Sequence, residues 1–152
     1  MTTEFFIFTI NIGSGTNYLH YFNPPLTDIT VPLKSTYPYP YPSIIDANSD
    51  PVSVSSVKDM STGTLPAFIT YSSTGISINP TLITQVKAYT IVVYISDTRE
   101  TAQASFVLTV TNQAPVVTQI IPSLLDLTFG DDVTYNLPAS KDPEGLPYTT
   151  KI

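Results

Sequence analysis

The sequence of 152 residues contains no cysteine, one histidine and only six lysines and arginines. The absence of cysteine excludes disulfide bridges, thiolate nucleophiles and cysteine-ligated zinc. Six cations against twelve acidic residues give a formal net charge of -6. So few basic side chains cannot form the positive surface that neutralises phosphates, so we expect no nucleic-acid partner.

The sequence also lacks an apolar run of the roughly 20 residues that cross a bilayer. The longest run, Phe5 to Ile12, is interrupted by Thr9 and Asn11. A secretory signal fits poorly there as well, because Glu4 stands where such signals carry positive charge. We expect that none of the 152 residues inserts into a membrane. If the protein is exported, we expect its targeting signal to lie outside this sequence.

Groups that carry out catalysis are equally scarce. The sequence has no Gly-x-Ser-x-Gly elbow, and no glycine-rich phosphate loop follows a predicted strand. His20 lies two residues from Tyr18 and from Phe22, so a strand would place it on the face with these two aromatic side chains or at the edge of that face. This position favours a structural or exposed histidine over a catalytic one. The adjacent carboxylates Asp131 and Asp132 are most simply a turn. The sequence therefore predicts no enzyme and no catalytic residues.

Residues typical of β-strands are abundant, with 23 threonines, 15 serines, 10 tyrosines and 7 phenylalanines. Residues 88–96 and 104–111 predict two strands, and the polar segment between them predicts an antiparallel hairpin. The weaker predicted strands cover residues 27–33, 52–57, 67–71, 76–78, 116–121, 124–129 and 133–137. We expect no helix. The predicted fold class is all-β.

Two stretches of the chain resemble each other, each with a strand, a polar turn, a second strand and a proline. The matched prolines are Pro25 and Pro115, and an acidic turn follows each, at residues 46–52 and 142–148. A repeat of about 90 residues has the size of an immunoglobulin-like domain. Chance similarity between two β-hairpins is the alternative interpretation.

The repeat divides the chain into three predicted parts. Residues 1–23 would supply the last two strands of a preceding or donor unit. Residues 24–112 would form one complete sandwich. Residues 113–152 would begin a following unit.

Residues 65–115 carry a resemblance to a known family. They contain Leu65-Pro-Ala-Phe-Ile-Thr-Tyr, a turn with Thr74-Gly, a strand from Ala88-Tyr-Thr to an aspartate, and Asn112-Gln-Ala-Pro. This order resembles the dystroglycan-type cadherin-like domain and the similar immunoglobulin-like repeats of large surface proteins. The resemblance implies a fold of immunoglobulin- or cadherin-like β-sandwich repeats, in which residues 24–112 form one complete cadherin-like sandwich. It also implies a spacer or adhesive module at the cell surface or outside the cell.

The acidic turns are candidate metal sites. Asp46, Asn48 and Asp50 offer oxygen ligands at every second position, as in the similar turn of that family. Calcium is therefore the candidate cofactor. Calcium takes six to eight oxygens, so these three side chains make at most half a site. Asx turns that cap the backbone are the alternative. The boundary at residues 111–115 carries no acid, which argues against a rigid calcium clamp between domains.

The segment Tyr37-Pro-Tyr-Pro-Tyr-Pro cannot be a central strand, because proline removes donors from the hydrogen-bond ladder. One interpretation is an edge strand whose rings cover the sandwich. The other is a surface for glycans, with Tyr37, Tyr39 and Tyr41 as stacking platforms. A carbohydrate-binding surface module is therefore the alternative function.

Apolar residues at both ends predict an assembly. Residues 113–152 lack the final strands that should cover their apolar side chains, and residues 1–23 are of the missing hairpin type. We expect copies of the chain to join head to tail by β-strand addition, or adjacent repeats of a longer chain to supply these strands. The predicted contact residues are Phe5, Phe6, Ile7, Phe8, Ile10 and Ile12 on one side and Leu125, Leu127, Phe129, Val133 and Tyr135 on the other. The expected function is that of a non-enzymatic extracellular structural or adhesive protein, part of a linear array or filament.

Overall fold

The computed structural model describes residues 17–97, 99–119, 129–130, 132, 134 and 136–151. In chain order its elements are β1 (Tyr21–Asn23), β2 (Ile29–Pro32), β3 (Tyr37–Pro40), β4 (Ser43–Ile45), β5 (Ser53–Asp59), β6 (Ile69–Tyr71), β7 (Gly75–Ile78), η1 (Ile83–Gln85), β8 (Ala88–Ser96), β9 (Thr101–Thr111), β10 (Val116–Val117) and β11 (Ser140–Lys141). The protein is all-β as the sequence predicts. The short 3-10 turn η1 is the one helical element within the described residues, and it was not expected from the sequence.

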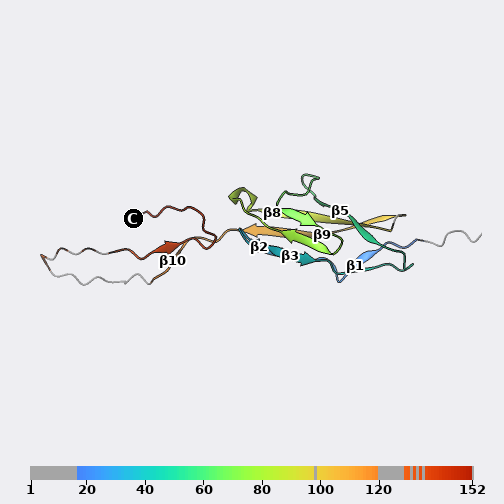
Figure 1. Ribbon diagram of the computed structural model, residues 1–152, viewed down its shortest axis with the longest axis horizontal. Coiled ribbons are helices and arrows are strands. Elements are labelled where there is room, and N and C mark those ends of the chain that lie inside the picture. Colours follow the sequence, from blue (N-terminus) through green and yellow to red (C-terminus); the bar gives the residue numbers. More distant parts are fainter. Residues whose placement is uncertain are drawn as a thin grey trace, which may run out of the picture.

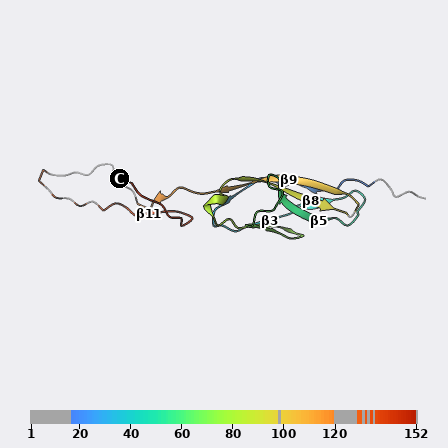
Figure 2. The ribbon, with the colours of Figure 1, turned by 90° about the horizontal axis from the view of Figure 1, so that it is seen from above.

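Two sheets pack face to face in a sandwich. One has the strand order β2-β9-β8-β5 and the other the order β3-β7-β6, and Figure 2 shows them as two layers. β2 runs parallel to β9, whereas the other neighbours in these sheets are antiparallel. Seven short strands in this arrangement define an immunoglobulin-like topology. The β1–β4 pair lies at one end of the sandwich, and the β10–β11 pair lies beyond the other end (Figure 1).

The hairpin of β8 and β9 forms the centre of the larger sheet. Alternate residues point into the sandwich, as period-two sequences require. Ile91, Val93 and Ile95 are buried in β8, and in β9 every second residue from Phe106 to Val110 is buried. Both strands that were most clearly predicted are therefore confirmed, although β9 begins three residues earlier than expected.

One aromatic contact joins the two sheets. Tyr39 of β3 stacks on Phe106 of β9 with ring centroids 4.5 Å apart and an interplanar angle of 14°. The Tyr39 hydroxyl donates to the carbonyl of Thr27 at 3.0 Å and accepts from the N–H of Thr27 at 2.8 Å. One side chain thus ties together both sheets and the segment before β2.

The proline-rich segment forms an edge strand, as one interpretation of the sequence predicts. Among the described strands β3 pairs with β7 alone, and Pro38 and Pro40 lie opposite Ser77 and Gly75. An edge position suits proline because the outer side of the strand has no ladder bond to lose.

The position of β1 corrects the predicted boundary after residue 23. β1 pairs with β4, Phe22 is a member of the core, and His20 is buried. A strand of three residues is too short for alternation to reveal which sandwich it joins. The central sandwich therefore includes residues before position 24, and the remainder of the three-part division stays a prediction.

Most weaker predicted strands occur with shifted ends, as β2, β5, β6 and β7. The strand predicted at 116–121 begins as β10 but ends at Val117. Residues 124–128 lie outside the described residues. Of the strand predicted at 133–137, the described residues 134, 136 and 137 are not in a strand.

Candidate functional site

Three segments of the chain meet at the end of the sandwich that carries β1. His20 lies directly before β1, Asp46 directly after β4, and Asp97 directly after β8. One ligand-type atom from each of these residues lies within 4.8 Å of the other two. The side chains of His20 and Asp97 are fully buried, and that of Asp46 is 5% exposed. We call this group the His–Asp–Asp cluster.

Each carboxylate of the cluster uses one oxygen to hold its own loop. Oδ1 of Asp46 accepts the backbone N–H groups two and four residues further on, at 2.8 and 3.2 Å. Oδ1 of Asp97 accepts the N–H groups two and three residues further on, both at 2.8 Å. Aspartate commonly caps a loop in this way at the end of a strand. The loops thereby fix the position of each Oδ2.

Nδ1 of the His20 imidazole is equally distant from these two Oδ2 atoms. Its Nε2 is 2.7 Å from the carbonyl oxygen of Ile95, and its Nδ1 is 3.9 Å from Oδ2 of both Asp46 and Asp97. A carbonyl can only accept, so the hydrogen bond assigns a proton to Nε2. Nδ1 has no hydrogen-bond partner among the described residues.

The His–Asp–Asp cluster carries negative charge. The pKa of Asp97 is lowered from 3.8 to about 2, mainly by the N–H of Glu100 and the side-chain amide of Asn17. Nδ2 of Asn17 donates to Oδ2 of Asp97 at 2.8 Å. Asp97 is therefore anionic at neutral pH. Oδ2 of Asp46 is buried without a hydrogen-bond partner in the described part of the chain.

The three predicted calcium ligands have different partners. Oδ1 of Asn48 accepts the N–H of Tyr18 at 3.1 Å. Oδ2 of Asp50 lies 4.0 Å from Nη1 of Arg99. Of the predicted set, Asp46 alone belongs to the His–Asp–Asp cluster.

The acidic turn at residues 142–146 repeats the geometry of the turn at residues 46–50. Oδ1 of Asp142 accepts the N–H groups two and four residues further on, at 3.1 and 2.8 Å. The fourth residue of each turn has a positive φ, 61° at Ser49 and 68° at Gly145. The two turns therefore have the same backbone design.

The repetition extends to the strands before the turns. β10 pairs with β11 antiparallel, as β1 pairs with β4. The N–H of Gln113 donates to the carboxylate of Glu144 at 3.2 Å, as the N–H of Tyr18 donates to Asn48. These bonds relate positions 95 residues apart (113 minus 18) and 96 apart (144 minus 48). The structural register thus differs from the predicted match of Pro25 with Pro115, which are 90 residues apart.

The second acidic turn rests on the far end of the central sandwich. Nζ of Lys34 donates to the carbonyl of Gly145 at 3.3 Å. Leu146 packs against the core of the sandwich, and Asp142 is buried. A contact of this kind restricts the orientation of the segment that follows residue 112.

The tyrosines of β3 and the residue after it do not form a shared exposed platform. Tyr39 is only 6% exposed because it stacks in the core. Tyr41 packs on Phe22 with ring centroids 5.7 Å apart, and Tyr37 is 39% exposed. The alternation places these side chains on the inner face of the edge strand. This geometry is contrary to the predicted glycan-stacking platform.

Replacing Tyr39 by phenylalanine should lower the free energy of unfolding by about 1–3 kcal/mol, because both backbone groups of Thr27 lose their partner. Tyr41→Phe is the matched control. Its hydroxyl is buried without a partner among the described residues, so we expect a change within about 0.5 kcal/mol. Urea unfolding at pH 7 measures both, and equal losses would contradict the assignment.

The same control has a pH dependence of its own. Burial, with a smaller contribution from Tyr71, raises the pKa of Tyr41 above its ordinary value of 10.0. A raised pKa in the folded state stabilises the protein below about pH 10 and loses that effect as the pH rises further. Above pH 10 we therefore expect the wild type to lose stability more steeply than Tyr41→Phe, as thermal unfolding at stepwise pH would show. Parallel curves would contradict this expectation.

Most predicted assembly residues fall outside the described residues. They are Phe5, Phe6, Ile7, Phe8, Ile10, Ile12, Leu125, Leu127, Val133 and Tyr135. Phe129 is described, and its side chain is fully exposed. Val116, Val117 and Leu137 are also exposed, each by 51%. Several apolar side chains after residue 112 are thus uncovered within this chain.

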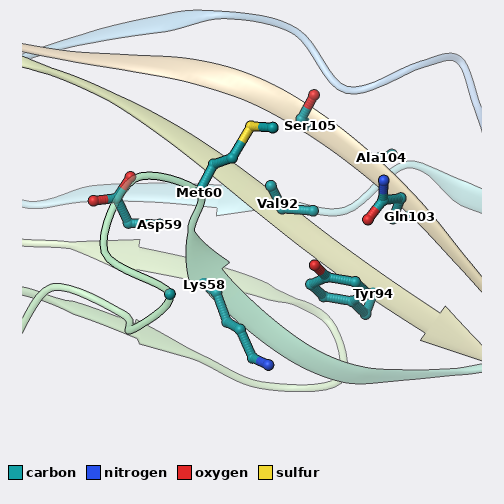
Figure 3. Close-up of a pocket in the computed structure, with 9 residues that line it drawn as sticks. Lys58, Asp59, Met60, Val92, Tyr94, Gln103, Ala104 and Ser105 are labelled. Carbon is teal, nitrogen blue, oxygen red and sulfur yellow. The ribbon is translucent and has the colours of Figure 1, made fainter.

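A shallow hollow of about 240 Å³ lies on the outer face of the larger sheet (Figure 3). Its charged groups already have partners. Nζ of Lys58 lies 5.5 Å from the centroid of the Tyr94 ring. The carboxylate of Asp59 accepts the hydroxyls of Ser61 and Thr62 at 2.7 and 3.2 Å. This hollow offers a weaker candidate site than the His–Asp–Asp cluster.

Within the part of the chain that the structure describes, no helix has the length and apolar character needed to span a membrane.

No model of a known protein family matches this chain, and no curated protein matches it. Among solved structures, it is similar to a chimeric titin Z1Z2 functionalised with a KLER exogenous peptide from decorin. That likeness has a TM-score of 0.45 and 17% identity, and covers 63% of this chain and 97% of the other. The chain is also similar to the titin domains Z1Z2 in complex with telethonin, with a TM-score of 0.46, 16% identity, and coverage of 68% and 54% respectively. The assignment of an immunoglobulin-like β-sandwich rests on the strand order given above.

Proposed function

We propose that this chain is a non-enzymatic structural or adhesive protein, a segment of a linear array of tandem β-sandwich units outside the cell. The observation that carries the proposal is the recurrence of one geometry. The β1–β4 pair and its acidic turn stand at the start of the central sandwich. The β10–β11 pair and its acidic turn follow that sandwich. A tandem array requires that each unit begin with an equivalent segment, and this chain contains two such segments.

The contact between the second acidic turn and the central sandwich supports a spacer function. In repeat proteins each unit contacts only its neighbours, so the stiffness of the array depends on each junction. Here Leu146 packs on the core and Lys34 binds the turn through the carbonyl of Gly145. The resemblance to repeats of large surface proteins favours a place at the cell surface or outside the cell.

We propose that the unit begun after residue 112 is completed by strand addition, from the N-terminal residues of another copy or from a continuing chain. Exposed apolar side chains at Val116, Phe129 and Leu137 support this idea. Each such side chain gains about 1.5–3 kcal/mol when it is fully buried. Chains joined in this heterologous way form a filament unless the contact closes into a ring.

Deletion of residues 1–16 tests the head-to-tail contact. The deletion stops before Asn17 because His20 and Phe22 are buried in the sandwich, so the remaining chain keeps its core. We expect the full chain to sediment as oligomers that increase with concentration, and the shortened chain to sediment as a monomer. Electron microscopy of the same samples should show filaments for the full chain alone.

Met60→Ser is the control for a general loss of apolar surface. Met60 is 72% exposed in the loop after β5, distant in sequence from both predicted contact surfaces. This variant should assemble like the full chain. A full chain that stays monomeric at high concentration, or a shortened chain that assembles equally well, would contradict head-to-tail complementation.

A further inference from the structure

We propose that the His–Asp–Asp cluster binds one divalent cation of the zinc class, held by Nδ1 of His20 and by Oδ2 of Asp46 and of Asp97. This inference is independent of the proposed array function, which needs no metal. It also differs from the calcium site predicted from the acidic turn, because it uses an imidazole nitrogen and a different aspartate.

The first argument is that the three atoms which face one another all accept hydrogen bonds. The Nε2 proton of His20 is committed to the carbonyl of Ile95 at 2.7 Å, which leaves a lone pair on Nδ1 in the neutral ring. An ionised carboxylate has no proton to offer that lone pair. Something positively charged must therefore lie between Nδ1 and the two Oδ2 atoms, either a proton or a cation.

The second argument is burial. His20 is 1% exposed and the Asp46 side chain 5% exposed. Nδ1 of His20 and Oδ2 of Asp46 have no hydrogen-bond partner in the described part of the chain. Buried charges in proteins are paired or coordinate metals, because desolvation of an isolated charge is costly. A bound cation would satisfy both atoms at once.

The third argument is distance. Nδ1 lies 3.9 Å from each Oδ2, whereas zinc bonds to nitrogen and to carboxylate oxygen together span about 4.0–4.3 Å. One ion can therefore contact the nitrogen and either oxygen. A tetrahedral angle brings nitrogen and oxygen to about 3.4 Å, so Nδ1 and each Oδ2 need to approach by about 0.5 Å.

The donor set decides the class of ion. Imidazole suits zinc and its transition-metal neighbours, whereas calcium prefers six to eight oxygens. The cluster supplies one nitrogen and two carboxylate oxygens. Oδ1 of Asn17, whose Nδ2 donates to Oδ2 of Asp97, is also buried without a partner among the described residues. Mixed nitrogen and oxygen ligands of this number favour zinc over calcium.

The ligands are already oriented by second partners, as in established metal sites. The Ile95 carbonyl holds the His20 ring. The loop N–H groups hold Oδ1 of each aspartate, and the Asn17 amide holds Oδ2 of Asp97 at 2.8 Å. A bound ion would cross-link three separate segments at one end of the sandwich. The sequence has no cysteine that could do so through a disulfide.

The second acidic turn provides an internal comparison. Asp142 makes the same loop as Asp46. In the structural register, which relates Tyr18 to Gln113, Pro115 stands at the position of His20. Proline offers no ligand. The proposal therefore assigns metal binding to the first turn and not to the second.

Histidine NMR tests the proposal directly, because His20 is the one histidine of the sequence. The full chain is labelled with ¹⁵N-histidine, freed of metal with a chelator and titrated with Zn²⁺ at pH 7. We expect the Nδ1 resonance to change with a one-to-one stoichiometry while Nε2 keeps its proton. A ring that stays protonated at both nitrogens in excess Zn²⁺ would overturn the proposal and identify a buried imidazolium.

Calorimetry of variants gives the second readout. Asp97→Asn and His20→Gln should weaken Zn²⁺ binding by about 10- to 100-fold or more, and should abolish the rise in melting temperature that Zn²⁺ gives the wild type. Asp142→Asn is the matched control and should leave the affinity unchanged. Equal loss in this control would show diffuse binding to acidic turns and overturn the assignment.

Calcium is the comparison ion in the same titrations. We expect Ca²⁺ to bind at least about tenfold more weakly than Zn²⁺, since one of the ligands is a nitrogen. Tighter binding of Ca²⁺ that survives His20→Gln would overturn the proposed ligand set. Circular dichroism of each variant distinguishes a lost ligand from a lost fold, and the wild-type NMR result does not depend on any variant.

Discussion

Phe106→Ala is expected to lower the free energy of unfolding by about 3–5 kcal/mol, the range for a buried phenylalanine cut back to alanine. Phe106 is 2% exposed and stacks on Tyr39 at 4.5 Å between ring centroids. Because the two rings come from opposite sheets, the truncation leaves a cavity at the sheet interface. Urea unfolding of the metal-free protein at pH 7 measures the change.

Phe129→Ala is the matched control, since it makes the same chemical change at a fully exposed ring. We expect its free energy of unfolding to stay within about 0.5 kcal/mol of the wild type at low protein concentration. A loss below about 1 kcal/mol for Phe106→Ala would mean that the stack does not join the sheets as described.

Gly75→Ala is expected to cost about 1–3 kcal/mol, the range for overpacking a close contact. A Cβ at Gly75 would lie 2.6 Å from the carbonyl oxygen of Tyr39 and 3.0 Å from Cα of Pro40. Both are backbone atoms, so the side chain cannot turn away and β3 must move off β7. Hydrogen exchange at the Tyr41 N–H, which donates to Thr74 at 3.0 Å, should speed up.

Ser77→Ala controls for a change of residue in the same strand. Ser77 lies opposite Pro38, and its side chain is exposed. This variant should keep both its stability, within about 0.5 kcal/mol, and the slow exchange of the Tyr41 amide. Unchanged exchange in Gly75→Ala would contradict the close approach of the two strands.

The prediction of strands succeeded where local pattern is strong. The β8–β9 hairpin has long alternation, so its strands could be read from composition and period alone. β1 and β4 have only three residues each. Such segments become strands because a partner lies opposite, and no local signal specifies that partner.

The proline-rich segment shows what alternation leaves open. Period two places Tyr37, Tyr39 and Tyr41 on one face, and proline restricts the segment to an edge. Whether that face points to solvent or to the core depends on the opposite sheet. Phe106 and Phe22 supply apolar partners there, so the rings of Tyr39 and Tyr41 turn inward and the three tyrosines do not form the predicted glycan platform.

The His–Asp–Asp cluster could be predicted only in part. Asp46 was recognisable from its acidic turn, but His20 had the appearance of an ordinary strand residue and Asp97 that of a hairpin residue. Their proximity depends on β1 pairing with β4 and on the packing of β8 beneath them. No spacing rule relates residues that come from three different loops.

The amino-acid sequence by itself determined the class of this protein: all-β, acidic, without thiols, and with a recurring acidic turn. These properties follow from composition and short-range period, which act within a few residues. Tertiary structure alone decided which face of β3 is buried, where the central sandwich begins, and that His20 lies close to two aspartates. Each of these depends on contacts between residues distant in the chain, and such contacts form only when the two sheets pack together.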